Sequence, residues 1–160
     1  MATVDLVQRL AELEQRVAAL ESGAHEPAPA EDADGGGAVG YGGLVSLGGG
    51  QVTWRIDVTP ERALSLADRP RIEVLAALAH PVRVDIVRFL LARGPQPAAA
   101  LQEAAHLGST GRLYHHLKAL TGSGVVEQDK RGSYRLRGAA TIPVLVLLTA
   151  ASDVAGQLRT

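Results

Sequence analysis

The sequence of 160 residues contains no cysteine. This absence excludes a disulfide framework, a zinc site built on thiolates and a cysteine nucleophile. The sequence also lacks the Gly-Lys-Ser/Thr phosphate loop, the Gly-x-Ser-x-Gly nucleophile elbow and the His-Glu-x-x-His zinc motif. We therefore expect a protein that is not an enzyme and that carries no cofactor.

A secretory signal and a long apolar run are also missing. Met1 to Asp5 lack the basic-then-apolar order of a signal peptide. The longest nearly uncharged stretch, Gly138 to Ser152, is interrupted by Pro143 and is shorter than the roughly 20 residues that span a bilayer. We expect a cytoplasmic protein that has no membrane partner and in which this stretch forms a buried helix.

The charges that are present are segregated along the chain. The net charge is −1, but residues 1–68 hold eleven acids and four bases, a net −7, whereas residues 69–137 hold eleven bases and five acids, a net +6. Asp153 and Arg159 cancel. The basic half is where a polyanion would bind.

Five apolar side chains near the N-terminus follow Thr3 at spacings of three and four residues: Leu6, Leu10, Leu13, Val17 and Leu20. They form the a/d seam of a heptad repeat. In a parallel dimer, Arg9 faces Glu14 of the partner helix. Arg16 likewise faces Glu21, so residues 1–22 predict a short parallel coiled coil that dimerises through these five residues. An amphipathic helix packed on its own domain is the alternative, because fewer than three heptads are marginal alone.

The next segments predict a linker and a hairpin. Residues 23–40 are too poor in large apolar groups to fold alone, which indicates a flexible linker. Tyr41–Leu47 and Gln51–Val58 flank three glycines, and the second stretch alternates apolar and polar residues, which predicts a β-hairpin with one apolar face. Thr59-Pro60 opens a short helix, with the threonine as N-cap, and completes a unit over residues 41–68.

Residues 69–138 predict a winged helix-turn-helix DNA-binding domain. Its expected helices are Arg71–Ala79, Pro81–Ala92, Pro97–Ala105 and a longer helix capped by Ser109 and stopped at Gly122–Gly124. Val125–Gln128 and Ser133–Leu136 alternate as strands around Asp129-Lys-Arg-Gly132, which predicts a wing with a basic tip. Helices of this size followed by strands form a compact layout that reads DNA.

The C-terminal residues 139–160 predict a helix that starts near Thr141 and Pro143. It is apolar over most of its girth, which argues that it is buried on both sides in a dimer through Leu145 and Leu148. The fold expected for the whole chain is therefore mainly α with small β-hairpins, an α+β winged helix-turn-helix with an N-terminal coiled coil and a C-terminal dimerisation helix.

Two stretches resemble the ArsR/SmtB family of winged-helix repressors. The stretch from Ala77 to Leu90 contains a His-Pro-Val-Arg step before an apolar helix, and Ser109 to Leu120 contains a His-Leu-Lys-Ala-Leu run, followed by Gly124-Val-Val. The resemblance covers about Pro70 to Leu136. It implies a homodimer that reads an inverted repeat, with the recognition helix in the major groove and the wing against the DNA backbone or minor groove.

The chain departs from the family in three respects. Metal-sensing members use cysteines near the recognition unit or acid and histidine ligands on the last helix, whereas this chain has no cysteine and Asp153 has no histidine near it. Gly111 in the first turn of the recognition helix costs roughly 1 kcal/mol of helix propensity relative to alanine. The coiled coil and the first hairpin lie outside the family's minimal domain. We therefore expect a member without a metal site.

The recognition helix should direct Leu113, Leu117 and Leu120 inward at helical spacing. The outward candidates for DNA contact are Thr110, Gly111, Arg112, Tyr114, His115 and Lys118. Arg112 suits a guanine edge and Lys118 suits a phosphate. The hydroxyls of Ser109 and Thr110, with the amides of this helix end, could hold a phosphate. Solvated side chains are the alternative for Arg112 and Lys118.

The two adjacent histidines do not indicate a metal site. Side chains of adjacent helical residues diverge by about 100°. His116 is expected to pack internally and His115 to meet the DNA backbone. In the wing, four basic residues lie within eight positions around Tyr134, and we expect three of them at the DNA: Lys130, Arg131 and Arg135. A solvated charged face is the alternative for this run, which ends at Arg137.

The function predicted from the sequence is a homodimeric, sequence-specific transcriptional regulator, a repressor, that reads an inverted repeat in double-stranded DNA with the helix Ser109–Leu120 and a basic wing. A protein–protein interaction module on the same scaffold is one alternative. A sensor that responds to a small molecule, with a pocket between Tyr41, Trp54 and the helices that follow, is another. The sequence does not reveal whether the protein has a small-molecule effector or a protein partner.

Overall fold

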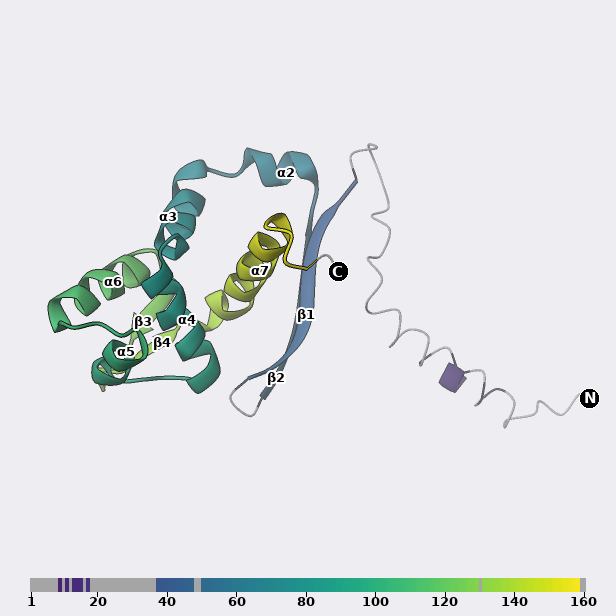
Figure 1. Cartoon of the computed structure of the whole chain (residues 1–160). Helices are drawn as coiled ribbons and strands as arrows, with labels where there is room; N and C mark the ends of the chain where they lie inside the picture. Colours follow the sequence, from purple (N-terminus) through teal and green to yellow (C-terminus); the bar gives the residue numbers. More distant parts are fainter. Residues whose placement is uncertain are drawn as a thin grey trace, which may run out of the picture.

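The computed structural model describes residues 37–47, 50–129 and 131–158, and in the N-terminal segment residues 9, 11, 13–15 and 17. The elements follow in the order β1 (Val39–Leu47), β2 (Gly50–Val58), α2 (Pro60–Ser65), α3 (Asp68–Leu78), α4 (Pro81–Arg93), α5 (Ala98–Ala104), α6 (Thr110–Gly122), β3 (Val126–Gln128), β4 (Tyr134–Leu136) and α7 (Gly138–Val154) (Figure 1). This order confirms the mainly helical α+β fold with two small hairpins that the sequence predicts.

One apolar core holds the winged-helix unit, which we define as α3 to β4, together. Its buried members are Ala77, Leu78, Ile86, Val87, Leu90, Leu101, Ala105, Leu113, Leu117, Leu120, Val125, Val126, Tyr134 and Val144. They come from every helix from α3 to α7 and from both wing strands. No polar or charged residue is buried in the part of the chain that the structure describes. Burial of apolar surface is therefore the main source of stability in this unit.

Side chains and left-handed residues fix where the helices begin and end. His80 caps α4, because its Nδ1 accepts a hydrogen bond from the Val82 amide at 3.2 Å. Gly94 ends the same helix at φ 71°, a value that glycine adopts without steric cost. His106 lies at φ 51° in the turn between α5 and α6. These residues fix both ends of α4 and the turn that precedes α6.

The wing is a short antiparallel hairpin with an extra bridge. Val126 pairs with Leu136 and Gln128 with Tyr134. Gln96, in the connection between α4 and α5, exchanges two backbone hydrogen bonds with Tyr134, at 2.9 and 2.8 Å. The wing is therefore tied to the helical core as well as to itself.

Helix α3 begins at Asp68, three residues earlier than predicted, and α2 ends at Ser65 instead of near residue 68. The predicted helix begins at Arg71, which leaves Pro70 outside it. Pro70 is tolerated instead in the first turn, where backbone amides have no intrahelical partner. The Asp68 carboxylate accepts a hydrogen bond from Arg71 Nε at 2.9 Å, which favours the earlier start.

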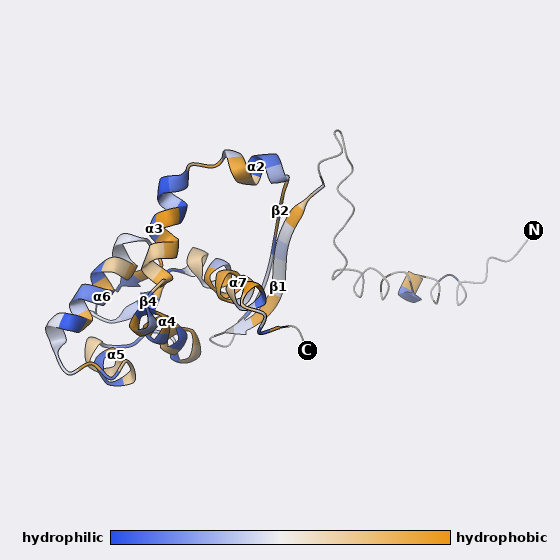
Figure 2. Cartoon of the chain, turned by 45° about the horizontal axis from the view of Figure 1, so that its top comes forward, coloured by the Kyte–Doolittle hydropathy of each residue, from blue (hydrophilic) through white to orange (hydrophobic). Residues whose placement is uncertain are grey.

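Helix α7 also starts early, at Gly138, and contains Pro143 in its interior rather than at its start. A proline at this position removes one hydrogen bond to residue 139, and the helix continues through the loss. Figure 2 shows its apolar colouring over much of its length. At 17 residues it remains short, and no described helix is long and apolar enough to cross a membrane.

The first hairpin supplies an intrachain neighbour for α7. β1 and β2 pair antiparallel from Val39 opposite Val58 to Leu47 opposite Gly50, which confirms the predicted hairpin. β1 lies alongside α7 and contacts it (Figure 1). The apolar surface of α7 thus faces the winged-helix unit on one side and the hairpin on another. The sequence prediction assigns the second partner of α7 to another subunit, and the structure adds this neighbour within the chain.

The predicted coiled coil falls mostly outside the described residues. Leu6, Leu10 and Leu20 lie outside them, whereas Leu13 and Val17 are helical and exposed. Residues 23–36 of the predicted linker also lie outside, and its last residues belong to β1. The coiled coil and the boundaries of the segments around it stay predictions.

The core of the winged-helix unit should depend on α6. Leu113 is 0% exposed, and replacing a fully buried leucine by alanine costs about 2–5 kcal/mol. We expect Leu113→Ala to lower the free energy of unfolding by that amount in urea denaturation. Leu44→Ala, at a leucine that is 57% exposed, should change it by less than about 0.5 kcal/mol. Equal effects of the two substitutions would contradict this account of the core.

Candidate nucleic-acid interface

Helix α6 separates an apolar face from a polar one. Leu113, Leu117 and Leu120 are buried, as the helical spacing predicts. The opposite face leaves six predicted contact residues exposed: Thr110, Gly111, Arg112, Tyr114, His115 and Lys118. The direction of these side chains is fixed by the burial of the leucines and does not depend on a ligand.

The start of α6 is held by its own hydroxyl groups. Ser109 Oγ accepts a hydrogen bond from the Arg112 amide at 3.4 Å, so Ser109 is the N-cap that the sequence predicts. Thr110 Oγ1 donates to Gln102 Oε1 at 3.2 Å, and Gln102 Nε2 donates to the Leu107 carbonyl at 3.1 Å. The two hydroxyls proposed as phosphate ligands therefore already brace the turn between α5 and α6.

The histidines lie in a basic environment at the junction of α4 and α6. The His116 ring lies 4.6 Å from the His80 ring, centre to centre, and is partly buried, as predicted. Burial lowers the pKa of His116, and the charges of His80, His115, Arg83 and Arg112 lower it further. Both effects favour the neutral form of the His116 imidazole.

His115 points to solvent beside it, with its ring edge-on to His116 at 5.6 Å. Within the described residues, no three or more histidine, cysteine or acidic side chains gather where they could hold a metal ion. His115 is thus available on the exposed face of α6.

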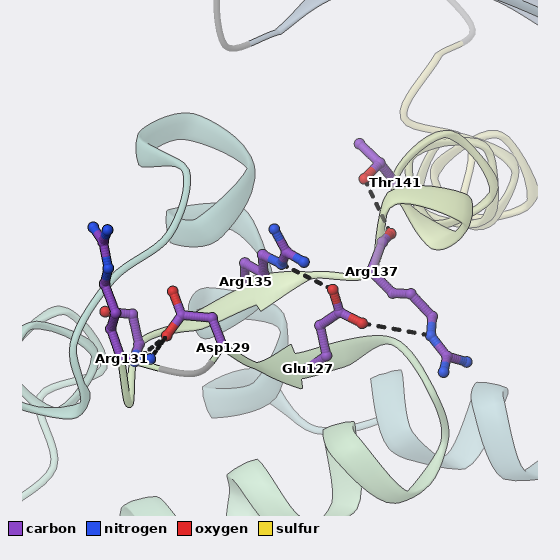
Figure 3. Close-up of polar contacts among 7 residues, drawn as sticks. Glu127, Asp129, Arg131, Arg135, Arg137 and Thr141 are labelled. Atoms are coloured by element: carbon purple, nitrogen blue, oxygen red, sulfur yellow. Dashed lines mark hydrogen bonds and ion pairs between the residues drawn. The ribbon is translucent and has the colours of Figure 1, made fainter.

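The tip of the wing is shaped by one carboxylate. Asp129 Oδ1 accepts hydrogen bonds from the backbone amides of Arg131 and Ser133, both at 2.9 Å (Figure 3). Gly132 completes the turn at φ 82°. Arg131 is exposed on this tip, and Lys130 lies outside the described residues.

The base of the wing joins two arginines through one glutamate. Arg135 Nε donates to Glu127 Oε1 at 2.8 Å, and Arg137 Nε lies 3.7 Å from Glu127 Oε2 (Figure 3). The sequence interpretation chose Arg135 as a DNA contact without its glutamate partner. The predicted contacts do not include Arg137, although a period of two that continues one residue past β4 places both arginines on one face.

Arg137 also joins the wing to α7. Its amide donates to the Val125 carbonyl at 3.1 Å, within the wing. Its own carbonyl accepts hydrogen bonds from the Ala140 amide at 2.8 Å and from Thr141 Oγ1 at 3.3 Å, in the first turn of α7. The residue is thus shared by the two elements.

A groove of about 870 Å³ runs between α6 and the wing. Tyr114 and Lys118 line it from α6, and Glu127, Gln128 and Arg137 line it from the wing side. We call it the α6–wing groove. The predicted recognition helix and the base of the wing therefore face one shared space.

The sequence comparisons agree with this geometry over the central third of the chain. Residues 78–129 match the model of a family described as a helix-turn-helix domain. That stretch runs from the end of α3 to the end of the first wing strand. The sequence matches none of the curated proteins with which it was compared.

Among solved structures, the chain is similar to NolR from Sinorhizobium fredii, with 24% sequence identity and a TM-score of 0.45, over 62% of this chain and 95% of NolR. At this identity and TM-score the likeness does not bear on what this chain binds. The membership of the ArsR/SmtB family in particular stays a prediction. The chain carries a helix-turn-helix domain within a winged-helix α+β fold, a layout that proteins use to read DNA.

Proposed function

We propose that the chain is a homodimeric, sequence-specific DNA-binding transcriptional regulator, a repressor that reads an inverted repeat. The observation that carries the proposal is the exposed face of α6, which presents Arg112, His115 and Lys118 and of which Lys118 lines the groove shared with the wing. A capped helix of this kind enters the major groove of duplex DNA in helix-turn-helix proteins.

The side chains divide the recognition between bases and backbone. Arg112, in the first turn of α6, can offer two parallel hydrogen bonds to a guanine edge. Lys118, two turns later, is a point charge suited to a phosphate. Tyr114, His115 and the wing residues Lys130 and Arg131 add backbone contacts that fix the register without reading sequence.

Exposed apolar side chains support the second copy in the proposal. Four of them lie on α2, on α3 or between the two helices: Leu64, Leu66, Ile72 and Leu75. Leu145 and Leu148 of α7 are only partly buried, and they line a groove of about 720 Å³ against Val84 and Leu91 of α4. An assembly with two-fold symmetry would cover such surfaces and would present two α6 helices one DNA turn apart, about 34–36 Å.

Base reading by Arg112 is tested by DNA selection. Sequences bound by the protein are selected from a random pool, and binding is then compared between the selected duplex and a scrambled one. We expect Arg112→Ala to weaken binding to the selected duplex by roughly 5- to 150-fold and to affect the scrambled duplex much less, because a base contact carries about 1–3 kcal/mol of discrimination.

Arg69→Ala is the matched control for this experiment, since Arg69 is an exposed arginine on α3 and carries the same charge. It should leave both affinities within about twofold. Equal losses on the two duplexes would place Arg112 at a phosphate instead of a base.

Phosphate contacts predict a steep dependence on salt. If about six phosphates are neutralised per complex, the affinity for the selected duplex should fall on the order of a thousandfold between ~50 and ~200 mM monovalent salt. Fluorescence anisotropy titrations over that range measure the slope. A flat dependence would remove the electrostatic part of the proposal.

The dimer is tested by sedimentation equilibrium at micromolar concentration. We expect the wild-type chain to be a dimer and Leu75→Glu combined with Leu148→Glu to shift it toward monomer, because two carboxylates would be placed in the apolar contact. Leu44→Glu on the hairpin is the control and should remain dimeric. A monomeric wild type that does not bind DNA would favour the protein–protein interaction module instead.

A further inference from the structure

The α6–wing groove contains a charge that opposes DNA. Of the described residues that line the groove, Glu127 alone is acidic, and Lys118 and Arg137 are basic. A duplex carries one negative charge per about 1.7 Å of its axis, so a carboxylate at this place repels any DNA strand that enters the groove. Glu127 therefore lowers the affinity of this surface for DNA.

The contacts of Glu127 show what it does in the free protein. It lies directly opposite Arg135 in the β3–β4 register, and its two carboxylate oxygens face the Nε atoms of Arg135 and Arg137, at 2.8 and 3.7 Å. Figure 3 shows it between the two arginines, whose side chains approach it from either side. One carboxylate thus serves as the internal counter-ion of two guanidinium groups.

The three side chains are exposed enough for a phosphate to replace Glu127 at the arginines. The side chains of Arg135 and Arg137 are 54% and 61% exposed and that of Glu127 is 33% exposed. Ion pairs at such exposure are weak and are screened by salt, so a phosphate can compete for the arginines. A phosphate that displaces Glu127 gains less binding free energy than it would from two unpaired arginines.

We propose that Glu127 lowers the affinity for DNA of any sequence by occupying Arg135 and Arg137, and that Arg137 is a further phosphate contact in the α6–wing groove. This inference rests on the proposed function. Because phosphate contacts carry no sequence information, a smaller contribution from them weakens binding to all duplexes alike. Discrimination between sequences is then left to the base contacts of α6.

The experiment compares Glu127→Gln with Glu73→Gln. Glu73 pairs with Arg69 at 3.1 Å on α3, away from the wing (Figure 1), so both substitutions remove one negative charge that is paired with arginine. Binding to a random-sequence duplex is measured by fluorescence anisotropy across a salt series. We expect Glu127→Gln to bind about eightfold more tightly at ~0.1 M salt, with the log–log salt slope steeper by about 0.9, as for one additional phosphate contact.

Glu73→Gln should stay within about twofold of the wild type. A gain for Glu127→Gln that is no larger than the gain for Glu73→Gln, or a loss of affinity, would overturn the inference. A wild type that does not bind the duplex even at low salt would instead overturn the proposed function, so the two failures are distinguishable.

A second variant keeps the test valid if Glu127→Gln proves unstable in a thermal melt. Arg137→Ala should weaken binding to the same duplex and make the salt slope shallower by about 0.9, because one phosphate contact is lost. Arg69→Ala should leave the slope unchanged. An unchanged slope for Arg137→Ala would exclude Arg137 from the interface and would overturn that half of the inference.

Discussion

The burial of Leu113, Leu117 and Leu120 is the constraint on which the rest of the molecule depends. These three side chains fix the rotation of α6 about its own axis, and the rotation decides which residues meet solvent. Arg112 and Lys118 face outward because the leucines face inward. The Ser109 cap and the Thr110–Gln102 hydrogen bond set where the helix begins. The interface is therefore a by-product of core packing and is present before any ligand arrives.

In the wing, packing fixes the position of the backbone but not that of the charged side chains. Its buried residues, Val126 and Tyr134, join the same core, and a bridge to Gln96 holds it in place. Its outward residues are arranged by weak ion pairs that any nearby anion can disturb. The orientation of α6 is thus fixed by apolar contacts, whereas the charged side chains of the wing can exchange their ion-pair partners for a nearby anion. Such a division suits a protein that must distinguish one sequence among many similar duplexes.

The elements and the outward face of α6 could be predicted from the sequence because each depends on local spacing. The leucine period, the Ser109 cap and the alternation along the hairpins are short-range signals, and the structure confirms them. What failed depends on distant or competing partners. The glutamate partner of Arg135 follows from the register of a hairpin, and the neighbour of α7 lies about a hundred residues earlier in the chain. The starts of α3 and α7 were missed because proline was read as a boundary, whereas both helices accommodate it.

The shared position of Arg137 has a mechanical consequence. Its amide belongs to the wing sheet and its carbonyl to the first turn of α7, with no intervening loop to absorb displacement. The end of the wing and the start of α7 are therefore held at one residue. Since α7 also contacts the first hairpin, the hairpin, α7 and the end of the wing form one continuous series of contacts that ends at the arginines bound by Glu127.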